Sequence, residues 1–270
     1  MDLDFPLILS WAVIISGSIW LVDAVAFRPR RLRAAEAYRA GAAGNPDEET
    51  VNQMLKEPLL TEYARSFFPV LLLVLVLRSF LFEPYQIPSE SMVPTLEVGD
   101  FILVNKFAYG IRLPVLGTKI FDVGEPQRGD VMVFIPPHEP RYFIKRVVGL
   151  PGDHVRYQDK VLTINGERIA QEYIDQITID GRPYIQIYYE TLGSHRHRIY
   201  RYPARVERPQ EWTIPEGHYF MMGDNRDRSD DSRRWGFAAD EKVVGKAVAV
   251  WVHKEPGLHW PTFARNGWIN

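Results

Sequence analysis

A serine and a lysine in this sequence have surroundings that could make them chemically reactive. Ser91 lies in the stretch Pro-Ser-Glu-Ser-Met-Val-Pro-Thr-Leu, residues 88–96. Pro88 and Pro94 stiffen the backbone there and favour an extended chain. A hydroxyl held on such a segment is suited to act as a nucleophile. The same pattern is typical of an ordinary turn serine, so Ser91 alone does not decide between the two.

The lysine is Lys145, in the alternating segment Tyr-Phe-Ile-Lys-Arg-Val-Val, residues 142–148. The two-residue period of a strand places Lys145 on the same face as Phe143 and Val147, and Arg146 on the opposite face. A lysine on an apolar face is desolvated, which lowers its pKa and allows it to act as a base near neutral pH. The alternative is a lysine that extends past a strand edge into solvent.

A third polar stretch runs from Gly223 to Gly236 and combines charges, amides and hydroxyls in one loop. It is either a solvated connection or a hydrogen-bonded scaffold whose Ser and Asp side chains orient a nearby lysine.

Two apolar runs precede these stretches. Phe5 to Val22 is uncharged and about long enough to span a bilayer. The chain begins Met-Asp-Leu-Asp rather than with the basic region of a signal peptide, and a cluster of arginines follows the run at 28–33. The positive-inside bias therefore places the N-terminus outside and the arginines in the cytoplasm. We expect an uncleaved anchor.

The second run, residues 67–82, spans a membrane if Arg78 reaches the outer headgroups; a buried core helix is the alternative. Two spans return the chain to the outside. The expected organisation is an extracytoplasmic N-terminus 1–4, a transmembrane helix 5–27, a cytoplasmic loop 28–64, a second transmembrane helix 65–83 and an extracytoplasmic catalytic β domain 84–270.

From Tyr85 onward, short β-branched and aromatic runs alternate with Gly-Asp and Pro turn signals, and Asn165-Gly166 is typical of a hairpin turn. This pattern predicts a mainly β fold: a coiled antiparallel sheet preceded by two transmembrane helices. Residues from about 155 to 217 are more polar and predict an inserted β subdomain.

Composition excludes several kinds of function. The 32 Lys and Arg residues against 34 Asp and Glu argue against a nucleic-acid partner. The chain has no cysteine, which excludes disulfides and thiolate chemistry. His195 and His197 share a strand face, but no acidic third ligand lies beside them, so neither a metal nor another cofactor is expected.

The three polar stretches together resemble the type I signal peptidases, the membrane-bound Ser/Lys endopeptidases of bacteria. The matching segments are 88–96, 99–107, 128–131 with 143–153, and 223–236, in the family's order and after two anchors in the family's place. The two-anchor form is similar to the Gram-negative kind. One departure is Glu90, where a small residue is expected between the two serines.

The resemblance implies a serine endopeptidase with Ser91 as nucleophile, neutral Lys145 as general base and an acyl-enzyme intermediate. The oxyanion hole would combine the Ser91 backbone N–H with the Ser89 hydroxyl. Ser229 would orient Lys145, and Asp231 and Arg233 would form a supporting ion pair.

The implied substrate is the signal peptide of an exported preprotein, cut after an Ala-x-Ala-like motif. The implied location is the bacterial inner membrane, with the lipid bilayer and possible contact with the translocation machinery as partners. Shallow apolar pockets would hold the small substrate residues; by resemblance, the pocket residues are Ile87, Met92, Leu96, Ile102, Val133, Phe143 and Ile144.

Two other interpretations stay open at this point. Self-cleaving repressor-like peptidases share the Ser/Lys chemistry but need a DNA-binding helical domain where this chain has two anchors. In a membrane-tethered β scaffold, Ser91 and Lys145 would be structural. Substituting either residue would then harm folding or binding rather than cleavage.

Overall fold

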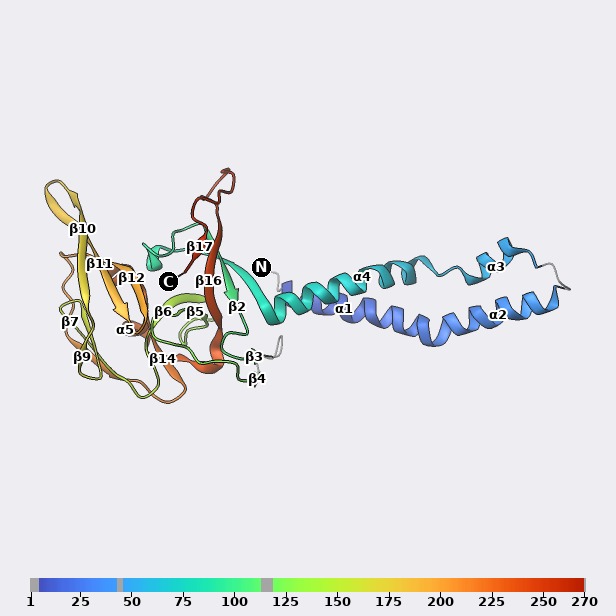
Figure 1. Cartoon of the computed structure of the whole chain (residues 1–270), viewed down its shortest axis with the longest axis horizontal. Coiled ribbons are helices and arrows are strands. Elements are labelled where there is room, and N and C mark those ends of the chain that lie inside the picture. Colours follow the sequence, from blue (N-terminus) through green and yellow to red (C-terminus); the bar gives the residue numbers. More distant parts are fainter. Residues whose placement is uncertain (1–4, 43–45, 113–118, 270) are drawn as a thin grey trace. The chain divides into compact units, whose positions relative to one another are not determined.

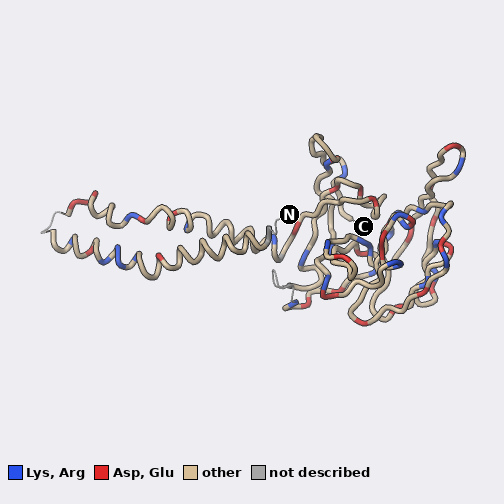
Figure 2. The backbone as a smooth tube through the Cα atoms, turned by 180° about the vertical axis from the view of Figure 1, so that it is seen from behind, with Lys and Arg blue, Asp and Glu red and all other residues tan. Residues whose placement is uncertain are grey.

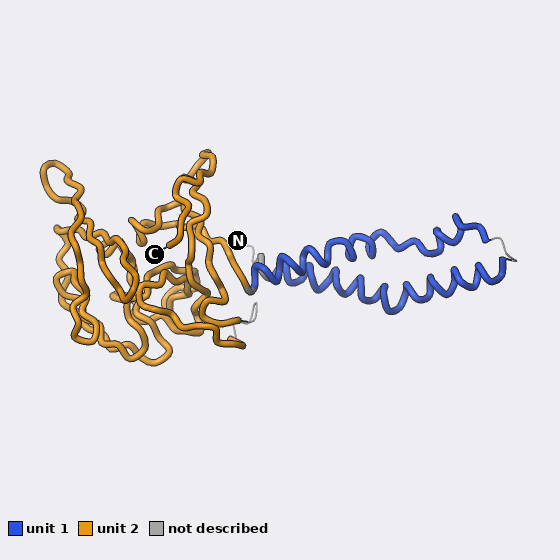
Figure 3. Tube along the Cα trace, viewed as in Figure 1, with its two compact units in different colours: residues 1–79 blue, residues 80–270 orange. Residues whose placement is uncertain are grey.

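The chain divides into two compact units, residues 1–79 and 80–270 (Figure 3). The computed structural model describes residues 5–42, 46–112 and 119–269. The N-terminus expected outside the membrane, residues 1–4, lies outside the described residues.

The first unit is a pair of packed helices with helical extensions. Helices α1 (Phe5–Val22) and α4 (Leu59–Val76) lie side by side (Figure 1). Gly17 permits close approach, because a Cβ there would lie 2.7 Å from the Phe68 ring. The Trp20 and Phe68 ring centroids are 5.5 Å apart. The remaining helical segments are η1 (Asp23–Phe27), α2 (Arg28–Gly41), α3 (Glu48–Leu55) and η2 (Leu77–Leu81).

Among the described residues, two helical stretches, Leu7–Gly41 and Leu59–Ser79, are long and apolar enough to cross a membrane by length and composition. Large apolar side chains on both, such as Trp11 and Leu73, are exposed rather than packed. The charges of this unit gather on α2, α3 and the start of α4 (Figure 2). A helix with an apolar, unburied surface is what a lipid environment would accommodate.

The second unit is built on one antiparallel sheet of eight strands. Its order is β1-β2-β16-β5-β6-β14-β15, with β17 also paired to β16 (Figure 1). The strands are β1 (Phe82–Gln86), β2 (Asp100–Asn105), β5 (Val131–Phe134), β6 (Phe143–Gly149), β14 (His218–Met222), β15 (Ala238–Ala239), β16 (Val243–His253) and β17 (Gly267–Trp268).

The sheet curls around β16, its longest strand. Register shifts interrupt the pairing of β16 with β2 and with β5, and such irregularities bend a strand and increase its twist. Gly245 permits the bend, because a Cβ there would lie 2.4 Å from the Asn105 carbonyl oxygen. The coiled antiparallel sheet predicted from the sequence is confirmed.

The chain leaves this sheet after β6 and returns to it at β14, which pairs with β6. The excursion forms two smaller antiparallel sheets, which confirm the inserted β subdomain. One sheet contains β13 (Gln210–Thr213), β7 (His154–Gln158), β8 (Val161–Ile164) and β9 (Glu167–Arg168); the other contains β10 (Gln171–Ile179), β11 (Arg182–Leu192) and β12 (His195–Arg201). Separately, β3 (Ile111–Arg112) pairs antiparallel with β4 (Lys119–Phe121).

Short helical turns complete the unit; η3 (Glu90–Met92) contacts β6, and α5 (Ser232–Trp235) contacts β14. The remaining turns are η4 (Arg226–Arg228) and η5 (Asp240–Lys242). η3 lies in the connection from β1 to β2 and contacts both β6 and η4. The segments 88–96 and 223–236 are therefore brought to the same strand, β6.

A buried ion pair secures β6 to the loop after β14. The Arg146 guanidinium donates to both oxygens of the Asp224 carboxylate, at 2.8 and 2.7 Å, and both side chains are fully buried. Burial acts to raise the Asp224 pKa, but the charge of Arg146 outweighs it and lowers that pKa to about 2. Arg146 also donates to the Gly129 carbonyl at 2.6 Å.

We predict that Arg146→Leu lowers the free energy of unfolding by about 3–5 kcal/mol, because it leaves the Asp224 carboxylate buried without its partner. Urea unfolding of the detergent-solubilised chain, followed by tryptophan fluorescence, measures this. Arg182→Leu, at an exposed arginine on β11, is the matched control. Equal effects of the two substitutions would contradict the prediction.

Candidate active site

The nucleophile candidate, Ser91, lies in a short turn that packs on the hydrophobic core. Ser89 is extended, and η3 then turns the chain through Ser91. Met92 and Leu96 are almost completely buried in the cluster beneath the turn. From the other side, Asn225 donates its backbone N–H to the Ser91 carbonyl at 3.1 Å and its amide to the Glu90 carbonyl at 3.0 Å. The backbone on both sides of the Ser91 hydroxyl is thus fixed.

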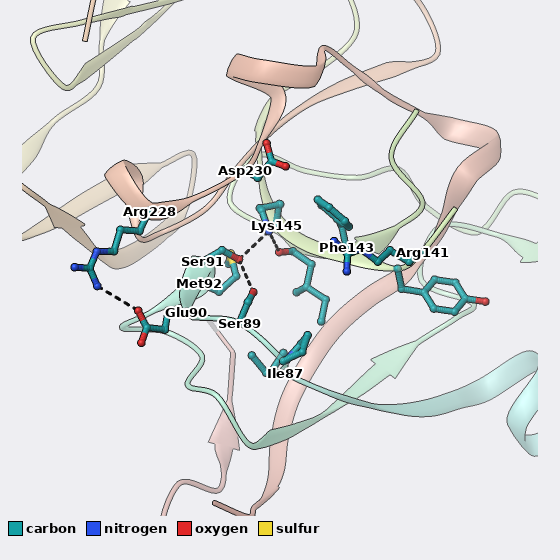
Figure 4. Close-up of a pocket in the computed structure, with 13 residues that line it drawn as sticks. Ile87, Ser89, Glu90, Ser91, Met92, Arg141, Phe143, Lys145, Arg228 and Asp230 are labelled. Carbon is teal, nitrogen blue, oxygen red and sulfur yellow. Dashed lines mark hydrogen bonds and ion pairs between the residues drawn. The ribbon is translucent and has the colours of Figure 1, made fainter. Parts of the chain in front are cut away.

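Lys145 reaches this hydroxyl from β6. Its Nζ lies 2.8 Å from Ser91 Oγ and donates to the Ile144 carbonyl at 2.9 Å (Figure 4). The Phe143 ring lies beside the amine, with its centroid 5.2 Å from Nζ. Arg146, the next residue, points to the opposite side of the strand, where it binds Asp224. The strand alternation inferred from the sequence therefore directs the Lys145 amine to Ser91 and the Arg146 guanidinium to Asp224.

The site lowers the pKa of Lys145. Only 4% of the residue is exposed, and burial disfavours the ammonium form, which lowers the pKa to about 8. The negative charges of Asp231, Asp230 and Asp224 act in the opposite direction. Because burial outweighs them, a substantial fraction of this lysine is neutral at mildly alkaline pH.

Ser89 stands on the other side of the nucleophile candidate. Its Oγ lies 3.3 Å from Ser91 Oγ, and both line the same cavity. A hydroxyl at this position can turn to donate to an oxygen that develops charge near Ser91.

The loop 223–236 forms a buried scaffold next to these groups. Arg233 donates to both oxygens of Asp231, at 2.8 Å each, and Asp231 accepts the Gly223 backbone N–H at 3.1 Å. Burial acts to raise the Asp231 pKa, but the Arg233 charge outweighs it and holds the pKa below its usual range. Glu207 also accepts from Arg233, at 3.1 Å.

Ser229 packs against this scaffold. Its buried Oγ has no partner within hydrogen-bonding geometry among the described residues, although it lies near enough to Asp231 to help lower that pKa. A Cβ at Gly223 would lie 2.3 Å from Ser229 Oγ and 2.4 Å from the Ser91 carbonyl oxygen. Ser229 and Ser91 are therefore close neighbours across Gly223.

A cavity of about 390 Å³ opens at Ser91 and Lys145. Of the expected pocket residues, Ile87, Met92, Phe143 and Ile144 line it (Figure 4). Leu96, Ile102 and Val133 do not line it. These three are fully buried in the apolar cluster that also contains Met92 and Ile144.

The cavity also has lining residues that sequence reasoning did not select: Pro88, Glu90, Arg141, Tyr142, Arg228 and Asp230. Each lies within two residues of a predicted site residue in the sequence. Extending the candidate set by sequence proximity would have found them.

The two histidines of the His195-x-His197 pattern make separate contacts. His195 Nδ1 lies 3.1 Å from the Arg128 carbonyl oxygen. His197 is buried between Glu190 and Asp224, and burial lowers its pKa to about 4, which keeps it neutral. Among the described residues, no group of three or more His, Asp or Glu side chains is arranged to hold a metal ion.

The family of this chain follows from a family model and from curated relatives. The family model "Signal peptidase, peptidase S26" matches residues 60–252. Signal peptidase I of Pseudomonas aeruginosa is 53% identical, with 100% of each chain covered. Signal peptidase I of Haemophilus influenzae is 34% identical and covers 96% of this chain and 88% of its own. A solved signal peptidase I from Enterococcus faecalis shares 33% identity over 46% of this chain and 98% of its own, with a TM-score of 0.31. This chain belongs to the signal peptidase family, peptidase S26.

Proposed function

We propose that this protein is a membrane-bound serine endopeptidase that removes signal peptides from exported preproteins after an Ala-x-Ala-like motif, with Ser91 as nucleophile and Lys145 as general base. Membership of the family makes the chain a signal peptide-processing peptidase. The observation that carries the mechanism is the 2.8 Å approach of a buried lysine amine to the Ser91 hydroxyl inside a cavity.

In the proposed acylation step, Ser91 Oγ attacks the carbonyl carbon of the scissile peptide bond while the neutral Lys145 amine takes the hydroxyl proton. The substrate oxygen becomes negatively charged and accepts hydrogen bonds from the Ser91 backbone N–H and the Ser89 hydroxyl. The lysine ammonium then returns its proton to the leaving amine, and the C–N bond breaks. The products of this step are the mature N-terminus and an acyl-enzyme.

Deacylation uses the same two groups. Neutral Lys145 takes a proton from a water molecule, which attacks the ester carbon. The proton then passes to Ser91 Oγ as the ester bond breaks, and the signal peptide leaves with a new carboxyl group, which releases its remaining proton to water. The lysine must be neutral at the start of each step, which is why its desolvation matters.

Substrate binding is assigned to the apolar part of the cavity. Ile87, Met92, Phe143 and Ile144 would contact the small side chains before the scissile bond. The core behind this wall would keep the wall in place. It is filled by Leu96, Ile102 and Val133. A packed wall leaves little room for large substrate side chains.

We assign positioning roles to the 223–236 scaffold. Asp231, held by Arg233, binds the Gly223 backbone, and Ser229 packs against the same glycine. In the substrate complex, the Ser229 hydroxyl, which has no partner in hydrogen-bonding geometry within the described part of the chain, would turn to Lys145 and orient the amine. The scaffold would thereby fix the positions of both reacting groups, the Ser91 hydroxyl and the Lys145 amine.

The two apolar helices would anchor the enzyme in the bacterial inner membrane. The proposed arrangement keeps residues 1–4 and the catalytic domain 84–270 on the extracytoplasmic side, where exported preproteins emerge. The spans expected at 5–27 and 65–83 would contact lipid, the second only as far as Leu81, because Phe82 and Glu83 belong to strand β1. Residues 28–64 would form the cytoplasmic loop. The translocation machinery is the further partner that this placement suggests.

We predict that Ser91→Ala and Lys145→Ala each lower kcat/KM at least about a thousandfold, because each removes a reacting group. Cleavage of a synthetic Ala-x-Ala preprotein segment by the detergent-solubilised chain measures this. Ser194→Ala and Lys242→Ala, at exposed positions of the same unit, are the matched controls. Unchanged cleavage by either active-site variant would exclude the dyad, and retained folding without cleavage would exclude a purely structural role.

We predict that kcat/KM rises with pH through about 8 and then levels off, because only the neutral form of Lys145 accepts the Ser91 proton. Asp230→Asn should move the midpoint to lower pH, since the Asp230 charge raises the Lys145 pKa. Asp175→Asn, at an exposed residue of β10, is the control and should not move the midpoint. A midpoint that stays fixed in Asp230→Asn would contradict the assignment of the titration to Lys145.

We predict that Gly223→Ala lowers kcat/KM at least about tenfold, since the added methyl group displaces the Ser91 backbone or Ser229 from the reactive geometry. Gly267→Ala is the matched control, because a Cβ there has open space and the backbone is not in the left-handed region. Adding Ser229→Gly should not restore full activity, because the contact with the Ser91 carbonyl remains. Wild-type activity of Gly223→Ala would contradict the prediction.

A further inference from the structure

We propose that Glu90 and Arg228 form the subsite for the substrate residues that follow the scissile bond, and that each of the two charges offsets the effect of the other on a charged substrate residue there. This inference rests on the proposed roles of Ser91 and Lys145. It assigns a function to two charged residues that line the cavity without taking part in the proposed chemistry.

The direction of the bound substrate follows from the two ends of the cavity. From Ser91, the wall formed by Ile87 and Phe143 lies to one side, and Glu90 and Arg228 lie to the other (Figure 4). The small residues before the cut require the apolar side. An extended substrate therefore continues past Ser91 toward the charged pair.

Neighbouring groups hold the Arg228 guanidinium and the backbone that carries the Glu90 carboxylate. Arg228 Nη2 donates to the Tyr184 hydroxyl at 2.5 Å, and its guanidinium lies 4.8 Å from the Tyr202 ring centroid. The Glu90 carbonyl accepts from the Asn225 amide, which fixes the backbone that carries the carboxylate. Removing the Glu90 charge should consequently leave Arg228 near its present position, and removing the Arg228 charge should leave the Glu90 carboxylate on a fixed backbone at the edge of the cavity.

The two charges remain accessible to a substrate. Arg228 Nη1 lies 3.4 Å from Glu90 Oε2, and the side chains are 38% and 62% exposed. Exposed ion pairs of this kind are weak, so a charged substrate residue competes readily with the intramolecular partner. While both are present, their effects on a substrate charge largely cancel. With one absent, the remaining charge acts alone.

The test uses three Ala-x-Ala peptides that differ only at the second residue after the cut, which is Glu, Gln or Lys. The measured quantity is the ratio of kcat/KM for the Glu peptide to that for the Lys peptide, because a general loss of activity cancels in the ratio. Glu90→Gln should raise this ratio about two- to fivefold relative to wild type, and Arg228→Gln should lower it by a similar factor. Both changes should shrink at high salt.

Two further variants separate charge recognition from a structural role. The exchange Glu90→Arg with Arg228→Glu restores the pair and should return the ratio close to the wild-type value. Arg196→Gln breaks an ion pair with Glu172 elsewhere on the unit and should leave the ratio unchanged. If Glu90→Gln and Arg228→Gln slow all three peptides by the same factor, the pair is only structural and the proposal is wrong. Failure of the Ser/Lys mechanism would show separately, as cleavage that survives Ser91→Ala.

Discussion

The burial of one lysine amine is the constraint around which the catalytic unit is arranged. Lys145 must be desolvated to lose its charge, yet its Nζ must stay within 2.8 Å of Ser91 Oγ. A flexible side chain in solvent would satisfy neither condition. Strand β6 meets both conditions, because its alternation directs Lys145 to the cavity and Arg146 to the buried Asp224. The position of the Lys145 amine therefore depends on the Arg146–Asp224 ion pair on the opposite face of the same strand.

Three buried arginine–carboxylate pairs converge on the loop that follows β14. Asp224 binds Arg146 of β6, Arg226 binds Glu190 of β11, and Asp231 binds Arg233 within the loop. These pairs join the main sheet, the inserted subdomain and the scaffold beside Ser91. Desolvating six charges is costly, so such pairs give little net stability. Their contribution here is to fix the positions of the elements they join. Removing one partner would leave the other charge buried and unpaired, which is strongly destabilising.

His197 lies between two of these ion pairs and carries no charge itself. Its ring is buried among the Glu190 and Asp224 carboxylates, and both ring nitrogens lack hydrogen-bond partners among the described residues. Burial keeps it neutral, which leaves Arg146 and Arg226 as the cations that these carboxylates bind. The histidine therefore fills space between two ion pairs without competing for either.

Local patterns predicted a large part of this structure. The period-two alternation at 142–148 separated Lys145 from Arg146, and Asn165-Gly166 forms the β8–β9 turn with positive φ at both residues. Patterning could not distinguish a cavity wall from the core behind it, because both are apolar. Ile87 and Ile102 illustrate this, since the first lines the cavity and the second is buried behind it.

Contacts between side chains far apart in the chain could not be predicted from the sequence. Arg146 and Asp224 are 78 positions apart, and no local signal joins them. On the inserted subdomain, Arg196 and Arg201 of β12 stack on Tyr189 and Tyr188 of the neighbouring strand. Such contacts depend on the register of β11 against β12, which a single sequence does not specify.

The most direct test of this account is the pKa of Lys145 itself, independent of turnover. Lysine labelled with ¹³C at Cε reports ionisation by NMR, and the loss of one resonance in Lys145→Ala assigns the signal in the detergent-solubilised chain. The account predicts a titration midpoint near 8. A midpoint near the usual lysine value of about 10.5 would contradict it, because the amine would then be charged when the reaction begins.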